Sequence, residues 1–145
     1  MKLIIDQREF SLINKINELL ANFQFKNIDV EVANLHIGDI LVKNEDTTFL
    51  IIERKTINDY CASIKDGRNR EQKKRLLSKF TKNQIIYLVE GSLDFVQSKY
   101  NRVNSDTVVS SILNTMMRDG IHVFHTKDSK EIWGEKTLRH CELWD

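Results

Sequence analysis

Short apolar runs separated by polar residues predict several β-strands. Residues 28–32 alternate apolar with acidic side chains, as expected for a strand with one buried face. Two further apolar runs, 39–43 and 48–55, are joined by the polar turn Asn44-Glu45-Asp46-Thr47 and therefore predict a β-hairpin. Other strands are predicted over residues 2–6, 84–89 and 121–126.

Apolar residues at helical spacing, together with capping and breaking residues, predict helices between these strands. Ser and Thr side chains suit the start of a helix because they accept hydrogen bonds from its first backbone N–H groups. The predicted helices run from the cap Ser11 to Phe23, from the cap Thr56 to Lys65, from beyond Asp66-Gly67 to Phe80, from Ser105 to Gly120, and onward from Asp128 or Ser129.

The order of these elements, β-α-β-β-β-α-α-β-α-β-α, predicts an α/β fold in which a mixed central sheet has helices on both faces. The chain of 145 residues is long enough for one compact domain. It contains no proline and no Gly/Ser-rich linker that would mark a boundary. We therefore predict a single domain over residues 1–145.

Charged residues gather at the end of the predicted hairpin. Side chains alternate along a strand, so Glu53 and Lys55 point to one side and Arg54 to the other. The hairpin folds the preceding strand back alongside, and this brings Asp39, at the start of that strand, near Glu53. Two carboxylates and an ammonium are thus expected to meet at one rim of the sheet.

These residue types suit metal-dependent cleavage of phosphodiesters. Mg²⁺ binds a few carboxylates and several waters, neutralises charge on phosphate and lowers the pKa of an attacking water. A nearby lysine can orient or deprotonate that water, or stabilise the transition state. We predict a Mg²⁺ (or Mn²⁺) site on Asp39 and Glu53 beside Lys55, with Asp6 and Glu9 as further contacts. The alternative is that the charges from Glu53 to Lys55 are simply solvated.

A basic segment follows the hairpin. Residues 65–82 contain eight basic and two acidic side chains, a net charge of +6, although the whole chain carries only +1. An acidic body with one basic segment fits an enzyme that uses a metal on a polyanion. We predict that the residues around Arg68, Lys73, Lys74 and Arg75 contact the phosphates of such a polyanion without reading bases. The alternative is a solvated helix face.

The bulk composition narrows the class of protein. The chain is 41% hydrophobic and 30% charged, as is ordinary for a globular protein. No apolar run approaches the roughly 20 residues that cross a bilayer, so we expect no membrane association. The opening MKLIID lacks the apolar stretch of a signal peptide. Cys61 and Cys141 lack metal-binding spacing, and a reducing intracellular compartment is expected.

Several motifs resemble, in order along the chain, those of the XPF family of structure-specific endonucleases, a branch of the restriction-endonuclease-like PD-(D/E)xK nucleases. Gly38-Asp39 followed by Glu53-Arg54-Lys55 and Asp59 looks like the family signature GD…ERKxxxD. Further similar motifs are Asp6-Gln7-Arg8-Glu9 (D-x-R-E), Asp66-Gly67-Arg68 with Glu71-Gln72-Lys73 and Arg75-Leu76 (D-G-R…E-Q-K-x-R-L), the strand end Leu88-Val89-Glu90-Gly91 and the strand 120–126.

This resemblance implies an endonuclease of restriction-endonuclease-like fold that cuts branched double-stranded DNA, such as a 3′-flap, fork or nicked junction, in repair or recombination. A location in the nucleus or another site that contains DNA would follow. The alternatives are a less specific restriction- or resolvase-like nuclease and a noncatalytic DNA-binding scaffold. The retained acids and lysine argue against the scaffold.

The resemblance also implies roles for individual residues. Asp39 and Glu53 would be the metal ligands and Lys55 the catalytic lysine. Asp6 and Glu9 would be acidic partners of the same site. Arg54 and Asp59 would support it, paired with each other or with DNA phosphate, and Arg68, Gln72 and Arg75 would line the DNA-facing edge.

Apolar residues in the C-terminal half predict a subunit interface. Residues 108–117 carry apolar pairs at every turn, and exposed apolar patches of this kind mark interfaces. The final region adds Ile132, Trp133, Leu138, Leu143 and Trp144. The resembled family dimerises through this half, so we expect a homodimer or a heterodimer with a related subunit. The alternative is that these residues complete the core.

Nothing in the chain resembles the family's helix-hairpin-helix module, so we expect weak, salt-sensitive DNA binding.

Overall fold

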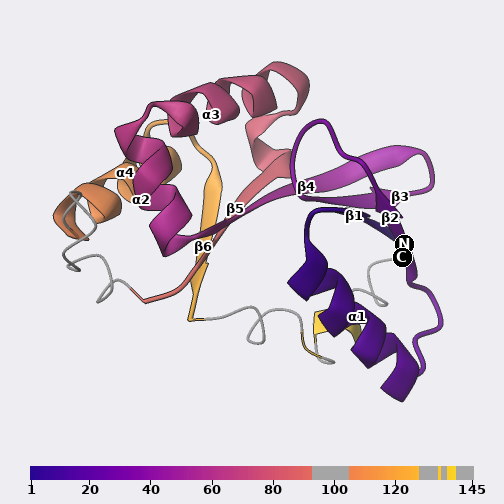
Figure 1. Ribbon diagram of the computed structural model, residues 1–145. Helices are drawn as coiled ribbons and strands as arrows, with labels where there is room; N and C mark the ends of the chain where they lie inside the picture. Colours follow the sequence, from indigo (N-terminus) through magenta and orange to yellow (C-terminus); the bar gives the residue numbers. More distant parts are fainter. Residues whose placement is uncertain (93–104, 128–133, 135–136, 140–145) are drawn as a thin grey trace. The chain divides into compact units, whose positions relative to one another are not determined.

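The computed structural model describes residues 1–92, 105–127, 134 and 137–139. These residues form an α/β fold with a six-stranded mixed sheet in the order β2-β1-β3-β4-β5-β6 (Figure 1). The chain divides into two compact units, one comprising Met1–Ile52 with the described C-terminal residues and the other Glu53–Lys127. The predicted α/β class and mixed sheet are confirmed, whereas a single domain over residues 1–145 stays a prediction.

The first unit is built on an apolar layer of short strands. Its elements are β1 (Lys2–Asp6), α1 (Phe10–Asn22), β2 (Asp29–Ala33), β3 (Ile40–Asn44) and the first part of β4 (Thr47–Thr56). β1 lies parallel to β2 and antiparallel to β3, which in turn is antiparallel to β4. Its buried apolar side chains include Leu3, Ile5, Leu12, Ile16, Leu19, Ile40, Val42 and Ile51. The predicted hairpin is confirmed.

The start of α1 differs from the prediction. The helix begins at Phe10 with Glu9 in the N-cap position, so the placement of Ser11 as the cap is wrong. A turn at the end of β1 explains the difference, because the Glu9 N–H donates to the Asp6 carbonyl at 3.0 Å. The Glu9 carbonyl then accepts from the Ile13 N–H at 2.9 Å, and the helix starts before Ser11 is reached.

The second unit packs three helices with two parallel strands. Its elements are α2 (Ile57–Lys65), α3 (Arg68–Lys79), the 3₁₀ helix η1 (Lys82–Gln84), β5 (Ile85–Glu90), α4 (Ser105–Met117) and β6 (His122–Thr126). The helix α2 contacts α3, α4 and β5, and α4 also contacts β6 (Figure 1). The Thr56 hydroxyl accepts from the Asp59 N–H at 3.2 Å, which confirms the predicted cap of α2. Of the predicted final helix from Asp128 or Ser129, only residues 134 and 137–139 are described, and residues 137–139 are helical.

None of the described helices combines the length and the apolar character needed to cross a bilayer.

Gly38 occupies a tight backbone position before β3, and this makes a testable prediction. Its φ is +73°, and an added Cβ would lie 2.6 Å from the side chain of the fully buried Ile51. Gly67 has a similar φ of +81° but has nothing within 4 Å of such a Cβ. We expect Gly67→Ala to lower the free energy of unfolding by about 1 kcal/mol through backbone strain alone, and Gly38→Ala by roughly 2–4 kcal/mol. Urea denaturation measures both, and equal losses would contradict the steric argument.

Candidate active site

A buried carboxylate ends β1. The Asp6 side chain is 1% exposed, and its two oxygens accept hydrogen bonds from the Leu35 N–H at 3.0 Å and from Arg8 Nε at 2.6 Å. Burial alone would raise the pKa of Asp6, but these hydrogen bonds and the charge of Arg8 outweigh it and hold the pKa below its ordinary value. Asp6 is therefore ionised at neutral pH, with both oxygens engaged by protein donors.

The other predicted acids of the first unit lie within electrostatic range of Arg8. Asp6, through its hydrogen bond and charge, raises the pKa of Arg8, and the negative charges of Asp39 and Glu9 add to this effect. Asp39 is half-buried directly before β3. Its backbone carbonyl accepts from the Asp6 N–H at 2.8 Å, and its own N–H donates to the Ile52 carbonyl at 2.9 Å. Asp6 thus binds the Arg8 guanidinium directly, and the other two acids act on it through their charge.

The end of β4 carries the charged tripeptide of the second unit. The guanidinium of Arg54 donates to both carboxylate oxygens of Glu90, through Nε at 2.9 Å and through Nη2 at 2.7 Å. The two side chains are only 15% and 6% exposed. Such a two-pronged, charge-assisted pair fixes orientation as well as distance. The sequence suggested Asp59 or a phosphate as the partner of Arg54, and the structure pairs it with Glu90 instead.

Lys55 lies on the side of β4 opposite to Arg54 by the alternation of the strand. Its ammonium donates to Oε1 of Gln72, which stands on α3, and both side chains are half-buried. Gln72 was predicted to line a DNA-facing edge, and the structure places its side-chain oxygen on the predicted catalytic lysine.

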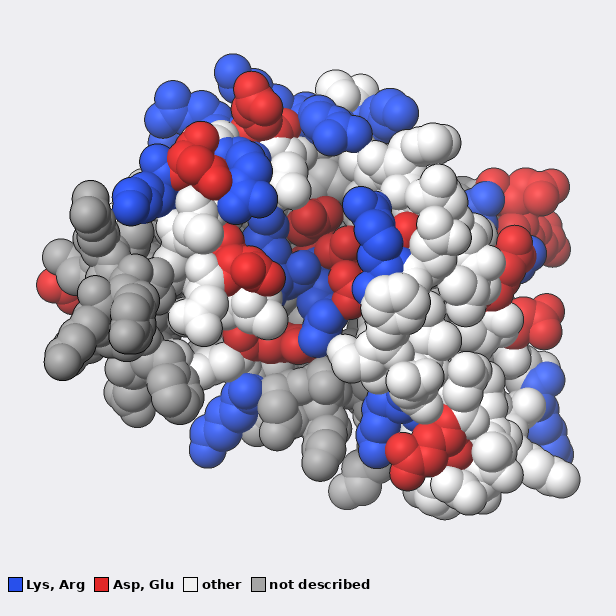
Figure 2. Space-filling view, in the orientation of Figure 1, with Lys and Arg blue, Asp and Glu red and all other residues white. Residues whose placement is uncertain are grey.

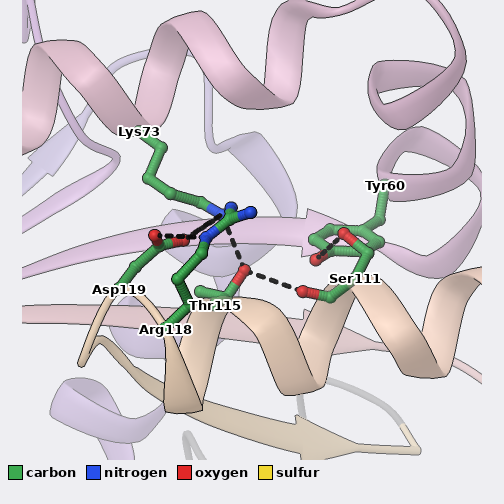
Figure 3. A network of polar contacts seen from close by, with 6 residues as sticks. All are labelled: Tyr60, Lys73, Ser111, Thr115, Arg118 and Asp119. Atoms are coloured by element: carbon green, nitrogen blue, oxygen red, sulfur yellow. Dashed lines mark hydrogen bonds and ion pairs between the residues drawn. The ribbon is translucent and has the colours of Figure 1, made fainter.

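The basic residues of α3 fall into two environments. Figure 2 shows Lys and Arg side chains gathered along α3 at the top of the view, with a few acidic residues among them. Arg68, Lys74 and Arg75 are exposed, and Arg68 donates to Asp66 at 2.7 Å. Lys73 is only 8% exposed, and its ammonium is bound inside the unit (Figure 3). The structure thus gives Lys73 internal contacts, and its predicted phosphate contact stays a prediction.

The buried Lys73 ammonium has two partners. It donates to the Thr115 hydroxyl and to the Asp119 carboxylate, each at 2.8 Å. Burial alone would raise the pKa of Asp119, but Arg118 and Lys73 outweigh this and hold the pKa below its ordinary value. The Asp119 carboxylate is therefore ionised at neutral pH opposite the Lys73 side chain.

The predicted metal site divides between the two units. Within the described part of the chain, no group of three or more His, Cys, Asp or Glu side chains is arranged to hold a metal ion. Asp39 belongs to the first unit and Glu53 to the second, so their meeting at one metal stays a prediction.

Sequence reasoning missed the partners that organise the second unit. Glu90 follows Arg54 by 36 residues, and Asp119 follows Lys73 by 46. An acid at the end of an apolar strand was a usable signal for Glu90, because a buried charge needs a partner. No local pattern connects Asp119 with Lys73.

The chain is similar to proteins of a known family. It matches the model of the ERCC4 domain over residues 5–133. An African swine fever virus protein, the ERCC4 domain-containing protein EP364R, is 36% identical over 134 residues, which cover 87% of this chain and 37% of that protein. The human structure-specific endonuclease subunit MUS81 is 34% identical over 128 residues, which cover 79% of this chain and 22% of that protein. The chain thus spans well under half of each relative.

A solved structure has the same fold. XPF from Aeropyrum pernix, in complex with DNA, aligns with a TM-score of 0.71 over 99% of this chain and 68% of that one, at 23% identity. At this identity the likeness concerns the fold alone.

The Arg54–Glu90 pair makes a prediction about stability. Arg54→Ala leaves a buried carboxylate without its cation, and we expect it to lower the free energy of unfolding by roughly 3–5 kcal/mol. The double variant Arg54→Met, Glu90→Leu removes both charges and should recover most of that loss. The control Arg68→Ala removes only the exposed pair with Asp66 and should have a far smaller effect. Urea denaturation at pH 7 measures all three, and similar effects of Arg54→Ala and Arg68→Ala would refute the assigned role.

Proposed function

This chain belongs to the ERCC4 domain family, and we propose that it is the nuclease domain of a metal-dependent DNA endonuclease that cuts branched DNA. The observation that carries the proposal is the end of β4. There Arg54 is bound to Glu90 on one side of the strand, and the alternation of side chains directs Glu53 and Lys55 to the other. A carboxylate and an ammonium held side by side suit hydrolysis of a phosphodiester.

Asp39 and Glu53 would hold the metal. Carboxylate oxygens are the donors that Mg²⁺ takes, and one or two of them with several waters complete its coordination. Asp39 donates its N–H to Ile52, the residue before Glu53, and this supports a shared ion. When bound, the cation would neutralise phosphate charge and lower the pKa of a water. Asp6 already accepts from Leu35 and Arg8, so we assign it an outer contact, with Glu9 beside it.

Lys55 would act on the reacting phosphate. Its ammonium donates hydrogen bonds and carries a positive charge, and both stabilise the extra negative charge of the transition state. It would also orient the attacking water toward phosphorus, while the P–O bond to the leaving nucleotide breaks. Asp59, in the first turn of α2, would support this end of β4.

Substitution of the three central residues tests this assignment. Asp39→Ala, Glu53→Ala and Lys55→Ala should each lower the cleavage rate by at least about 10²-fold, in line with the loss of one preorganised charge. The two acid variants should also weaken Mn²⁺ binding in calorimetry, whereas Lys55→Ala should bind Mn²⁺ normally. Glu45→Ala, which removes an exposed acid from the same hairpin, is the control. Normal cleavage by Glu53→Ala would overturn the assignment.

Branched DNA is the proposed substrate, and it would be bound mainly through phosphates. The human relative is described as a structure-specific endonuclease subunit, and the Aeropyrum XPF structure contains DNA. Arg68, Lys74 and Arg75 are the proposed contacts, since their side chains are exposed on α3. We leave Lys73 out because its ammonium is bound to Asp119.

The DNA contacts predict a change in salt dependence. Each lost phosphate contact should reduce the slope of log affinity against log salt by about one unit and weaken all sequences alike. We expect this of Lys74→Gln, and about twice the change in Lys74→Gln, Arg75→Gln. The control Lys15→Gln makes the same charge change on α1 and should alter neither quantity. Unchanged affinity and slope in the double variant, measured by fluorescence anisotropy, would leave these residues as a solvated helix face.

A second copy or a related subunit is the proposed protein partner, docked on α4 and β6. Val108 of α4 is fully buried, whereas Leu113 and Met117 of the same helix are 48% and 83% exposed, as is Phe124 of β6 at 57%. An apolar surface of this kind is typical of an interface, and the human relative is described as a subunit. Leu138, also predicted to lie there, is fully buried instead, and Trp133 and Trp144 are outside the described residues.

Self-association gives a direct prediction. Light scattering over a concentration series should give a dimer mass that Leu113→Glu reduces to that of a monomer, because a charge in an apolar interface loses its hydration. Phe10→Glu, at an exposed aromatic of α1, is the control and should leave the dimer intact. A monomer at every concentration would contradict self-association.

A further inference from the structure

Two neighbouring residues of α3 connect the proposed catalytic strand with α4. Consecutive helical side chains point about 100° apart, given 3.6 residues per turn. Gln72 therefore reaches Lys55 on β4, while Lys73 reaches Thr115 and Asp119. One turn of α3 is thus bound on two sides.

The contacts around Lys73 form a network that joins three helices (Figure 3). The Thr115 hydroxyl donates to the Ser111 carbonyl at 3.0 Å, and the Ser111 and Tyr60 hydroxyls share a hydrogen bond at 3.0 Å. Arg118 binds Asp119 from the outside, with Nε donating at 3.1 Å. Tyr60 lies on α2, Lys73 on α3, and Ser111 and Thr115 on α4. The network therefore joins α3 to α4 and, through Ser111, α4 to α2.

The buried ion pair of Lys73 and Asp119 is better explained by the position that it fixes for α3 than by a gain in stability. Two buried charges often contribute no more than an apolar pair of the same volume, because their desolvation opposes their attraction. They do select one arrangement, since a shifted helix would leave both charges unpaired in the interior. Lys73 and Asp119 therefore hold α3, and with it Gln72, in one position.

A second buried group, Tyr87, is influenced by the charges of both Glu53 and Asp119. Tyr87 is 1% exposed, and its hydroxyl has no hydrogen-bond partner within the described residues. Burial raises the pKa of Tyr87, and the negative charges of Glu53 and Asp119 raise it further. Glu53 and Asp119 thus act on one buried phenol, which stays protonated.

Gln72 has the right chemistry to hold an ammonium for use on a phosphate. Its amide oxygen accepts a hydrogen bond from Lys55 without adding a negative charge, so the cation is oriented but not neutralised. We propose that Gln72 is a positioning residue for Lys55, and that the buried Lys73–Asp119 pair keeps it in place. The proposal rests on the catalytic role proposed for Lys55, and it replaces a DNA contact as the role of Gln72.

Side-chain dynamics test the proposal without any cleavage. The ¹³C relaxation of the Lys55 Cε methylene should report a more ordered side chain than that of the exposed Lys74. Gln72→Leu removes the acceptor and should lower the order of Lys55 toward that of Lys74, whereas Gln72→Glu keeps an acceptor and should preserve it. Unchanged order of Lys55 in Gln72→Leu would overturn the proposal, and this result does not depend on whether the protein is a nuclease.

The role of the ion pair is tested in the same way. Asp119→Asn should lower the order of Lys55, while Arg118→Gln, which removes only the exposed partner of Asp119, should not. If Asp119→Asn does not fold, Thr115→Val removes one hydrogen bond of Lys73 at constant shape and should act in the same direction. An effect of Arg118→Gln as large as that of Asp119→Asn would overturn the assignment to the buried pair.

Cleavage kinetics separate positioning from DNA binding. At saturating branched DNA and Mg²⁺, Gln72→Leu should lower the single-turnover rate by roughly 10–100-fold, the penalty of a misplaced catalytic group. The DNA dissociation constant should change by less than about twofold, because Gln72 would not contribute to DNA binding. Weakened DNA binding with an unchanged single-turnover rate would restore the role of a DNA contact and overturn the proposal. No cleavage by the unaltered protein would instead refute the proposed function, while the relaxation measurement would still decide the position of Lys55.

Discussion

Side chains along β4 point alternately to its two sides, and the candidate site depends on this alternation. Arg54 is held by both oxygens of a buried Glu90, and this anchors one side of the strand. Because side chains alternate, the same anchor directs Glu53 and Lys55 to the other side. A shift of one residue would exchange the two sides and place the wrong charges in the interior. The pairing of Arg54 thus determines where the proposed catalytic charges lie.

Burial, rather than charge type, decides what the charged residues of this chain do. Lys73 and Lys74 are adjacent in the sequence, yet one ammonium is bound to Asp119 inside the unit and the other side chain is exposed. Asp6 is a predicted site acid whose oxygens already accept from Leu35 and Arg8. The helix α3 therefore carries a buried charge that is bound within its unit and exposed charges that are the proposed contacts of a polyanion.

Sequence patterns predicted those parts of the structure that form between residues close together in the chain. The hairpin and the Thr56 cap follow from alternation and from a hydroxyl at a helix start, and both are confirmed. The prediction of Ser11 as the cap was wrong because the turn from Asp6 to Glu9 starts α1 earlier. The partners of Arg54 and Lys73 are set by tertiary packing, which brings together residues 36 and 46 positions apart. The meeting of Asp39 with Glu53 stays a prediction, because the two acids belong to separate units.

The most direct test of the central claim is cleavage of a panel of end-labelled DNAs at low ionic strength. The panel comprises a 3′-flap, a fork, a nicked junction and a linear duplex of the same sequence, each with Mg²⁺, Mn²⁺ or EDTA. We expect cuts in one strand near the branch, dependent on the metal, and much slower cutting of the linear duplex. Equal cutting of linear and branched DNA would contradict structure specificity. Absence of any metal-dependent cleavage at high protein concentration would contradict the assignment as a nuclease.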